Sequence, residues 1–194
     1  HNKTIKSVSD LNIRPAFSFY NRSENLQKHL DSIKKILLEI LPQPFPFSDK
    51  TSLEKWISSS LPLIKWNKVI NSPDCLSMFF LFKPISFHAS EGFISEMIKR
   101  WLVPNEELTI LSFEHMLILF DLYPNQTLFI AKANILIKNK KQLDAIHQNL
   151  TFFKKELKLG LLSSKYGCLL HDSQVLPLDN KMSFIRQSLI KLIK

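Results

Sequence analysis

Apolar residues recur with helical spacing in the segment 23–41, at every third or fourth position, as on one buried stripe of an α-helix. The stripe is Leu26, Leu30, Ile33, Leu37 and Ile40. Ser23 is a suitable N-cap, because its hydroxyl can accept a hydrogen bond from a free backbone N–H of the first turn. Pro42 ends the segment, because proline lacks a backbone N–H and clashes with the preceding turn. The pattern therefore predicts an amphipathic helix over 23–41.

The same spacing predicts four further helices, over 52–60, 91–102 and 140–159 and from Asp179 onwards. Gly160 is expected to end the third of these, because glycine readily adopts the left-handed conformation that follows a helix C-terminus. In helix order, the positions expected to face inward are Leu53, Trp56 and Ile57; Phe93, Met97 and Trp101; Leu143, Ile146, Leu150, Phe153 and Leu157; and Met182, Ile185, Leu189 and Leu192.

Strand patterns occur in three segments. The run 76–82 is continuously apolar and rich in Phe, which is typical of a buried strand, although periodicity alone does not distinguish it from a buried helix. The runs 108–122 and 127–137 are joined by Tyr-Pro-Asn-Gln at 123–126, and a Pro-Asn turn between apolar runs predicts a hairpin. The order of elements lacks parallel-sheet repetition. The predicted class is therefore α+β, with amphipathic helices packed on a small, mainly antiparallel sheet.

The domain organisation expected from the sequence is simple. Residues 1–22 are polar with scattered apolar positions, and we expect an extended, strand-like arm. Pro62 and Pro73 bracket a stretch expected to be mostly loop. At this length one domain is the default, so 23–194 is predicted to form a single α+β domain. The chain starts without a methionine and stops inside a helical pattern, so we expect a fragment of a longer protein.

Charge is distributed unevenly along the chain. The 194 residues include 26 Lys and Arg against 17 Asp and Glu, a formal net charge of +9. Residues 132–194 hold 12 basic and 4 acidic groups, so nearly all the excess lies there. Of the basic residues 22 are Lys, which is a hydrated point charge rather than a bidentate fork; an AT-rich genome would produce the same bias. The three glycines cannot form a phosphate-cradling loop, which excludes Rossmann and P-loop enzymes and leaves no cofactor expected.

The predicted helix over 140–159 combines basic and aromatic positions outside its apolar seam. Lysines flank the seam or lie further round the helix, and Phe152 points away from it. A basic flank beside an outward aromatic side chain can bind single-stranded nucleic acid, and a basic amphipathic helix can bind an anionic membrane surface. The plainer interpretation is a solvated helix face, with Phe152 covered by another part of the protein. The anion-binding candidates are Lys140, Lys141, Lys154, Lys155 and Lys158.

The strand around His115 is the best enzyme candidate. Adjacent positions His115 and Glu114 could support general acid–base chemistry, and Cys75 could pair with a histidine as a nucleophile. The simpler interpretation is a histidine at a sheet margin and a buried, inert thiol. Cys75 and Cys168 lie far apart, and neither a C-x-x-C nor an H-x-x-x-H spacing occurs, so no disulfide framework and no metal site are predicted.

A motif of the form N-L-x-x-hydrophobic-x-x-E-hydrophobic-basic-L-G…S…Y occurs late in the chain. It consists of Asn149-Leu150, Phe153, Glu156-Leu157-Lys158-Leu159-Gly160, Ser163 and Tyr166, and is followed by Leu178-Asp179-x-Lys181, Ile185, Leu189 and Leu192. On these residues the segment 145–194 resembles an uncharacterised family of chlamydial proteins. The apolar stretch 167–171 departs from that family's more basic helix. The resemblance implies an intracellular bacterial protein and a domain cut from a longer chain, and it carries over no catalytic role.

Three hypotheses of function remain open. The first is a non-enzymatic protein-interaction or scaffolding domain, whose partner is another protein or the remainder of its own chain. The second is an anion-binding module for single-stranded nucleic acid or a membrane surface, centred on 140–158. The third is a hydrolase or transferase with a Cys–His or Glu–His site assembled in space. Apolar runs are too short for a transmembrane segment, and we expect a bacterial cytoplasmic protein or a secreted effector.

Overall fold

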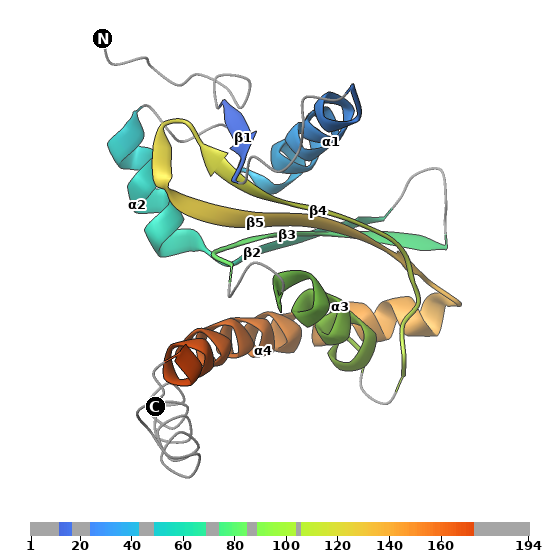
Figure 1. Cartoon of the computed structure of the whole chain (residues 1–194). Coiled ribbons are helices and arrows are strands. Elements are labelled where there is room, and N and C mark those ends of the chain that lie inside the picture. Colours follow the sequence, from blue (N-terminus) through green and yellow to red (C-terminus); the bar gives the residue numbers. More distant parts are fainter. Residues whose placement is uncertain are drawn as a thin grey trace. The chain divides into compact units, whose positions relative to one another are not determined.

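The computed structural model describes residues 12–16, 24–42, 49–68, 74–84, 89–103 and 106–172. The chain divides into two compact units. The first unit combines residues 1–84 with 108–142, and the second combines 85–107 with 143–194. Figure 1 shows the elements of both. Each unit is described by itself below.

A five-stranded antiparallel sheet forms the centre of the first unit. Its strand order is β1-β4-β5-β3-β2, so β1 and β2 are the two edges. With four helices in the described part of the chain, the sheet confirms the predicted α+β class. The strands are β1 (Ile13–Pro15), β2 (Leu63–Lys68), β3 (Cys75–Phe82), β4 (Ile110–Phe120) and β5 (Tyr123–Leu136).

Two helices, α1 (Glu24–Ile40) and α2 (Lys50–Ser60), cover one face of this sheet (Figure 1). The predicted stripe of α1 is confirmed: Ile33, Leu37 and Ile40 are fully buried in a core that they share with Leu53 and Ile57 of α2 and with sheet residues. Strand alternation supplies the sheet side of this core. The contributing sheet residues are Phe79, Leu81, Met116, Ile118, Phe120, Leu128 and Ile130.

The N-terminus of α2 shows how local sequence sets a boundary. Asp49 is the N-cap, and its carboxylate accepts a hydrogen bond from the Ser52 backbone N–H at 2.8 Å. The Ser52 hydroxyl in turn accepts one from the Asp49 backbone N–H at 3.2 Å. This reciprocal capping box satisfies two backbone donors and starts the helix two residues before the predicted position.

The hairpin turn is placed differently from the prediction. Phe120 of β4 pairs with Tyr123 of β5, so the turn is Asp121–Leu122 and Pro124 lies inside β5. The expectation of a turn at 123–126 is wrong because the chain already reverses at 121–122. The register shift between Ile118↔Leu128 and Phe120↔Tyr123 leaves Pro124 without a partner on β4, so its missing N–H costs no ladder hydrogen bond. The predicted buried strand at 76–82 is confirmed, and every residue of β3 is buried.

Both edge strands are short and difficult to predict. The stretch between Pro62 and Pro73 is expected to be mostly loop, but Leu63–Lys68 forms β2, paired along its length with β3. Apolar and polar residues alternate only over the four central positions, Ile64 to Asn67, and this is too short a strand pattern to stand out between the flanking prolines. Within the predicted arm, Ile13–Pro15 forms β1 and pairs with Ile118–Phe120 of β4.

The second unit contains α3 (Ala89–Trp101) and most of α4 (Lys140–Asp172). The seam predicted for α4 is confirmed in this unit, where Ile146, Leu150, Phe153 and Leu157 are buried. In α3 the predicted inward position Met97 is buried, together with Ile94, Ile98 and the following Leu102.

Trp101 is 51% exposed, so the expectation that it faces inward is wrong. The predicted stripe links Phe93, Met97 and Trp101 by steps of four residues. Each such step advances about 40° beyond a full helical turn. Two steps therefore carry Trp101 off the buried face of α3.

Gly160 does not end α4, which continues to Asp172. No glycine with positive φ occurs in the described residues, so the left-handed stop predicted here is wrong. A different constraint acts on Gly160: a Cβ atom at this position would lie 2.6 Å from Cζ of the Phe93 ring. Glycine is therefore present because α3 and α4 approach closely at Phe93. The predicted cap at Ser23, the helix from Asp179 and residues 1–11 of the arm lie outside the described residues.

This close approach predicts opposite effects for two helical glycines. Gly92 of α3 has no atom within 4 Å of an added Cβ, so Gly92→Ala should stabilise the protein by about 0.5–1 kcal/mol through helix propensity. Gly160→Ala should lose that gain to the clash with Phe93. In the Phe93→Ala background, Gly160→Ala should become stabilising. Urea denaturation of these variants measures the effects, and equal stabilisation by both single glycine substitutions would contradict the close approach.

Candidate functional site

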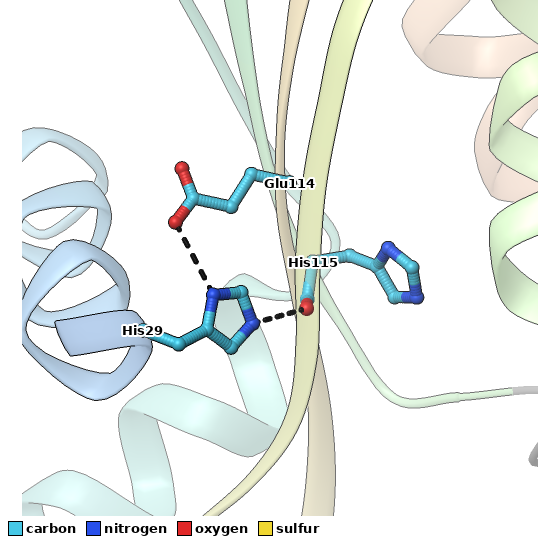
Figure 2. Close-up of polar contacts among 3 residues, drawn as sticks. All are labelled: His29, Glu114 and His115. Carbon is cyan, nitrogen blue, oxygen red and sulfur yellow. Dashed lines mark hydrogen bonds and ion pairs between the residues drawn. The ribbon is translucent and has the colours of Figure 1, made fainter. Parts of the chain in front are cut away.

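His29 of α1 joins two neighbouring residues of β4, and Figure 2 shows the cluster. Its Nε2 donates a hydrogen bond to the backbone carbonyl of His115 at 3.2 Å, since a carbonyl can only accept. Its Nδ1 lies 3.5 Å from Oε1 of Glu114, which is an ion pair when the ring carries both protons. The side chains of His29 and Glu114 are 36% and 32% exposed, so the cluster lies at the margin of the core.

The position of His29 along β4 explains this contact. The Ala16 backbone N–H, directly after β1, donates to the Leu117 carbonyl at 2.8 Å. His115 O is the next carbonyl on the same outer edge of β4, because edge-facing carbonyls recur every second residue. The His29 side chain therefore forms a hydrogen bond with an edge carbonyl of β4 just beyond the point where β1 ends. Side chains that occupy an open sheet edge protect it from pairing with another chain.

The residues predicted for an enzyme site are not brought together. Glu114 and His115 project to opposite faces of β4, and Figure 2 shows the His115 ring directed away from the His29–Glu114 pair. The His115 ring stacks on Phe129, with ring centroids 5.5 Å apart, and lies at the same distance from Phe113. His115 thus belongs to an aromatic cluster on its own face of the sheet.

Cys75 is a buried free thiol at the start of β3. It pairs with Leu136 of β5, whereas His115 pairs with Ala131 of the same strand. Five residues of strand separate these positions, which is roughly 17 Å. No Cys–His pair can therefore form between Cys75 and His115. The cluster that does form needs His29, and no local pattern in the sequence indicates which strand α1 crosses.

The lysines predicted to bind anions are all exposed on α4. Lys140 and Lys141 lie in its first turn, which belongs to the first unit. Lys154, Lys155 and Lys158 belong to the second unit, together with Phe152, which is 50% exposed. Phe152 thus lies outside the buried seam, as the helical spacing predicted.

A second exposed aromatic residue, Trp101, ends α3, and its backbone carbonyl contacts α4 one turn before Phe152. The Asn149 side-chain amide donates hydrogen bonds to the carbonyl oxygens of Trp101 at 3.1 Å and Leu102 at 2.8 Å, which fixes the end of α3 against α4. Phe152 is three residues beyond Asn149 and therefore neighbours it on the helix surface. Two exposed aromatic side chains thus come from adjoining points of two helices.

These residues define one surface of the second unit, called the aromatic–lysine face below. Around the circumference of α4, Asn149 lies about 60° to one side of Phe152, and Lys155 and Lys158 lie about 60° and 120° to its other side, whereas Lys154 is about 160° away. The neighbouring Arg100 on α3 is 70% exposed and pairs with Glu96 at 2.8 Å. The aromatic–lysine face consists of Trp101, Phe152, Lys155 and Lys158.

Two further properties bear on candidate chemistry. Within the described residues, no group of three or more His, Cys, Asp or Glu side chains could hold a metal ion. None of the helices in the same part of the chain combines the length and apolar content that crossing a bilayer requires. Comparison with family models, with curated proteins and with solved structures gives no match to this chain.

The His29 contact predicts a stability effect that exceeds that of an ordinary surface pair. His29→Ala should destabilise the protein by about 1 kcal/mol, because the His115 carbonyl at the edge of β4 loses its partner. As a matched control, Lys50→Ala breaks the exposed Lys50–Glu54 pair on α2, whose atoms are 3.7 Å apart, and should change stability little. Urea denaturation measures both, and a His29→Ala protein as stable as the wild type would contradict the anchoring role.

Proposed function

We propose that this chain is a non-enzymatic interaction domain whose aromatic–lysine face binds single-stranded nucleic acid. The proposal is carried by one observation: Trp101 and Phe152 are both half exposed, on two helices that Asn149 joins through the Trp101 backbone carbonyl, and exposed lysines follow Phe152 on α4. Exposed aromatic rings offer stacking platforms to bases, and lysines beside them neutralise phosphates. The resemblance of 145–194 to a chlamydial family adds no activity to this proposal.

The surroundings of the two rings favour a polyanion. Protein–protein interfaces are also enriched in Trp and Phe, but they are depleted in Lys at the core. Here Lys155 is one helical turn from Phe152, and Lys158 is one turn further on. Two acidic side chains of α4 are described in this unit: exposed Asp144 lies two turns before Phe152, and half-buried Glu156 lies one turn after it. The two exposed lysines outnumber the one half-buried carboxylate next to Phe152, so the charge beside this ring is net positive.

A partner protein is the second candidate, and one observation favours it. Trp101 and Arg100 are adjacent and exposed at the end of α3, and Trp and Arg are the residue types that most often dominate binding energy at protein interfaces. Such a partner would need an acidic segment to match the lysines. The same variants test both candidates when an acidic polypeptide is included beside the oligonucleotide.

Fluorescence anisotropy of a labelled oligo(dT) measures the proposed binding directly. Phe152→Ala and Trp101→Ala should each weaken binding by about 1–3 kcal/mol, roughly 5- to 150-fold, because each removes one stacking platform. Lys155→Gln/Lys158→Gln should lower the slope of log K against log salt by about 0.7 for each phosphate that the protein no longer neutralises.

Controls come from the same helix and from another exposed apolar side chain. Lys140→Gln/Lys141→Gln removes two exposed lysines outside the aromatic–lysine face, and Leu38→Ala truncates a side chain of the first unit that is 49% exposed. Both should bind like the wild type. Tighter binding of poly-glutamate than of oligo(dT) would favour the partner protein instead. Equal losses in control and test variants would contradict the proposed face.

A further inference from the structure

Four polar side chains form a continuous row across the first unit's sheet, on the face that α1 and α2 partly cover. Asn67 of β2 pairs in register with Ser77 of β3, Ser77 with Asn134 of β5, and Asn134 with Ser112 of β4. These four side chains lie on the same face of the sheet as the core residue Phe79. They form the row next to the one that contains Phe79, because side chains on one face recur at every second residue of a strand. We call Asn67, Ser77, Asn134 and Ser112 the polar row.

Hydrogen bonds within the polar row run in one direction. The buried Ser77 hydroxyl donates to Oδ1 of Asn134 at 2.6 Å. The Asn134 amide then donates to Oγ of Ser112 at 2.8 Å. Ser112 therefore receives a hydrogen bond and retains its own hydroxyl proton, for which the described residues provide no acceptor. Linked hydrogen bonds polarise one another. The hydroxyl of exposed Ser112, at the end of the row, is therefore a stronger hydrogen-bond donor than an isolated serine hydroxyl.

Lys132 lies on the same face as the polar row, in the neighbouring row of side chains, without a counter-ion among the described residues. It belongs to β5, two residues before Asn134, and is partly buried. Its Nζ lies 5.7 Å from the centroid of the Phe79 ring on β3. Glu114 is its partner in register across β4, but no carboxylate in the described part of the chain lies within ion-pair distance of Lys132 Nζ. Partly buried charges are normally paired, so this ammonium is suited to an external anion.

The other charged groups on this face already have partners. Glu114 faces His29, as Figure 2 shows. Glu39 of α1 accepts a hydrogen bond from the Asn67 amide at 3.1 Å. Lys65 of β2 donates to the Leu41 carbonyl at the end of α1 at 3.2 Å. Glu39 is thus engaged by Asn67, whereas Glu114 lies opposite Lys132 on β4 and forms an ion pair with His29 when that ring carries both protons.

From this arrangement we infer that Lys132, together with the polar row, binds a phosphate group. The Lys132 ammonium supplies the charge, and Ser112 and the second N–H of Asn134 supply directed hydrogen bonds. The Ser77 hydroxyl acts as a positioning group, because it fixes which side of the Asn134 amide faces outward. This site lies in the first unit and is separate from the aromatic–lysine face.

Nuclear magnetic resonance of the full ¹⁵N-labelled chain, titrated with inorganic phosphate, tests the inference. The amide signals of Ser112, Lys132 and Asn134 should shift together along one saturable curve. Lys132→Met keeps the length of the side chain over Phe79 and should weaken phosphate binding at this site at least about tenfold. Lys138→Gln, at an exposed lysine just after β5, and Lys155→Gln/Lys158→Gln should leave the curve unchanged.

Two further probes define the ligand and keep the test decisive. Glycerol phosphate reports whether a phosphate monoester binds as inorganic phosphate does, and either result supports the site. Acetate should bind more weakly, because it carries one negative charge and two oxygens. Equal binding of acetate, or identical phosphate curves for the wild type and Lys132→Met, would overturn the inference. Ser112→Ala provides a second variant at an exposed position, and it should also weaken binding.

Discussion

The first unit depends on burial of the apolar stripe of α1 against one face of an antiparallel sheet. Ile33, Leu37 and Ile40 are completely removed from solvent there, and each such side chain contributes about 2 kcal/mol. The stripe covers only some rows of the sheet. Side chains on a strand alternate with a period of two. The strands that complete this core therefore also place polar side chains on the same face, beyond the part that α1 covers. The helix contact therefore determines both where the core ends and where a polar surface begins.

A second constraint joins the helices of the other unit. The close approach at Gly160 and the two hydrogen bonds from Asn149 hold α3 and α4 together at separate points. With both helices fixed, Trp101 at the end of one and Phe152 on the other remain half exposed. Their exposure thus follows from how the helices pack. This is why the same packing that stabilises the unit also presents two aromatic rings to solvent.

Long periodic segments of the fold can be predicted from sequence, and short or exceptional ones cannot. The stripe of α1 and the run of β3 repeat a clear pattern over several turns or strand positions. The hairpin turn is misplaced in the prediction because Pro124 is tolerated inside a strand. The sequence does not predict β2 because only four of its six residues alternate and prolines lie on both sides. Gly160 resembles a helix stop in the sequence, although its requirement comes from Phe93, which is 67 positions away in the chain and adjacent only in the folded unit.

The candidate sites also differ in how far the sequence predicts them. Phe152 and the lysines of α4 can be placed from helical geometry alone, since they share one element. Trp101 joins them only through the Asn149 contact, and His29 meets Glu114 only because α1 crosses β4 at that point. The polar row depends on strand register, which four separated segments of sequence do not reveal. Surfaces assembled from one helix are thus predictable, whereas those assembled across strands require the structure.

The most direct measurement of the central claim uses the three tryptophans of the chain. Each indole N–H gives one signal in a nuclear magnetic resonance spectrum; Trp56 and Trp66 lie in the first unit, and Trp101 lies in the second. On titration with oligo(dT), the account predicts that the Trp101 indole signal and the backbone amides of 152–158 shift, while the Trp56 and Trp66 signals stay in place. Shifts at Trp56 or Trp66 without change at Trp101, or no shifts at all, would contradict it.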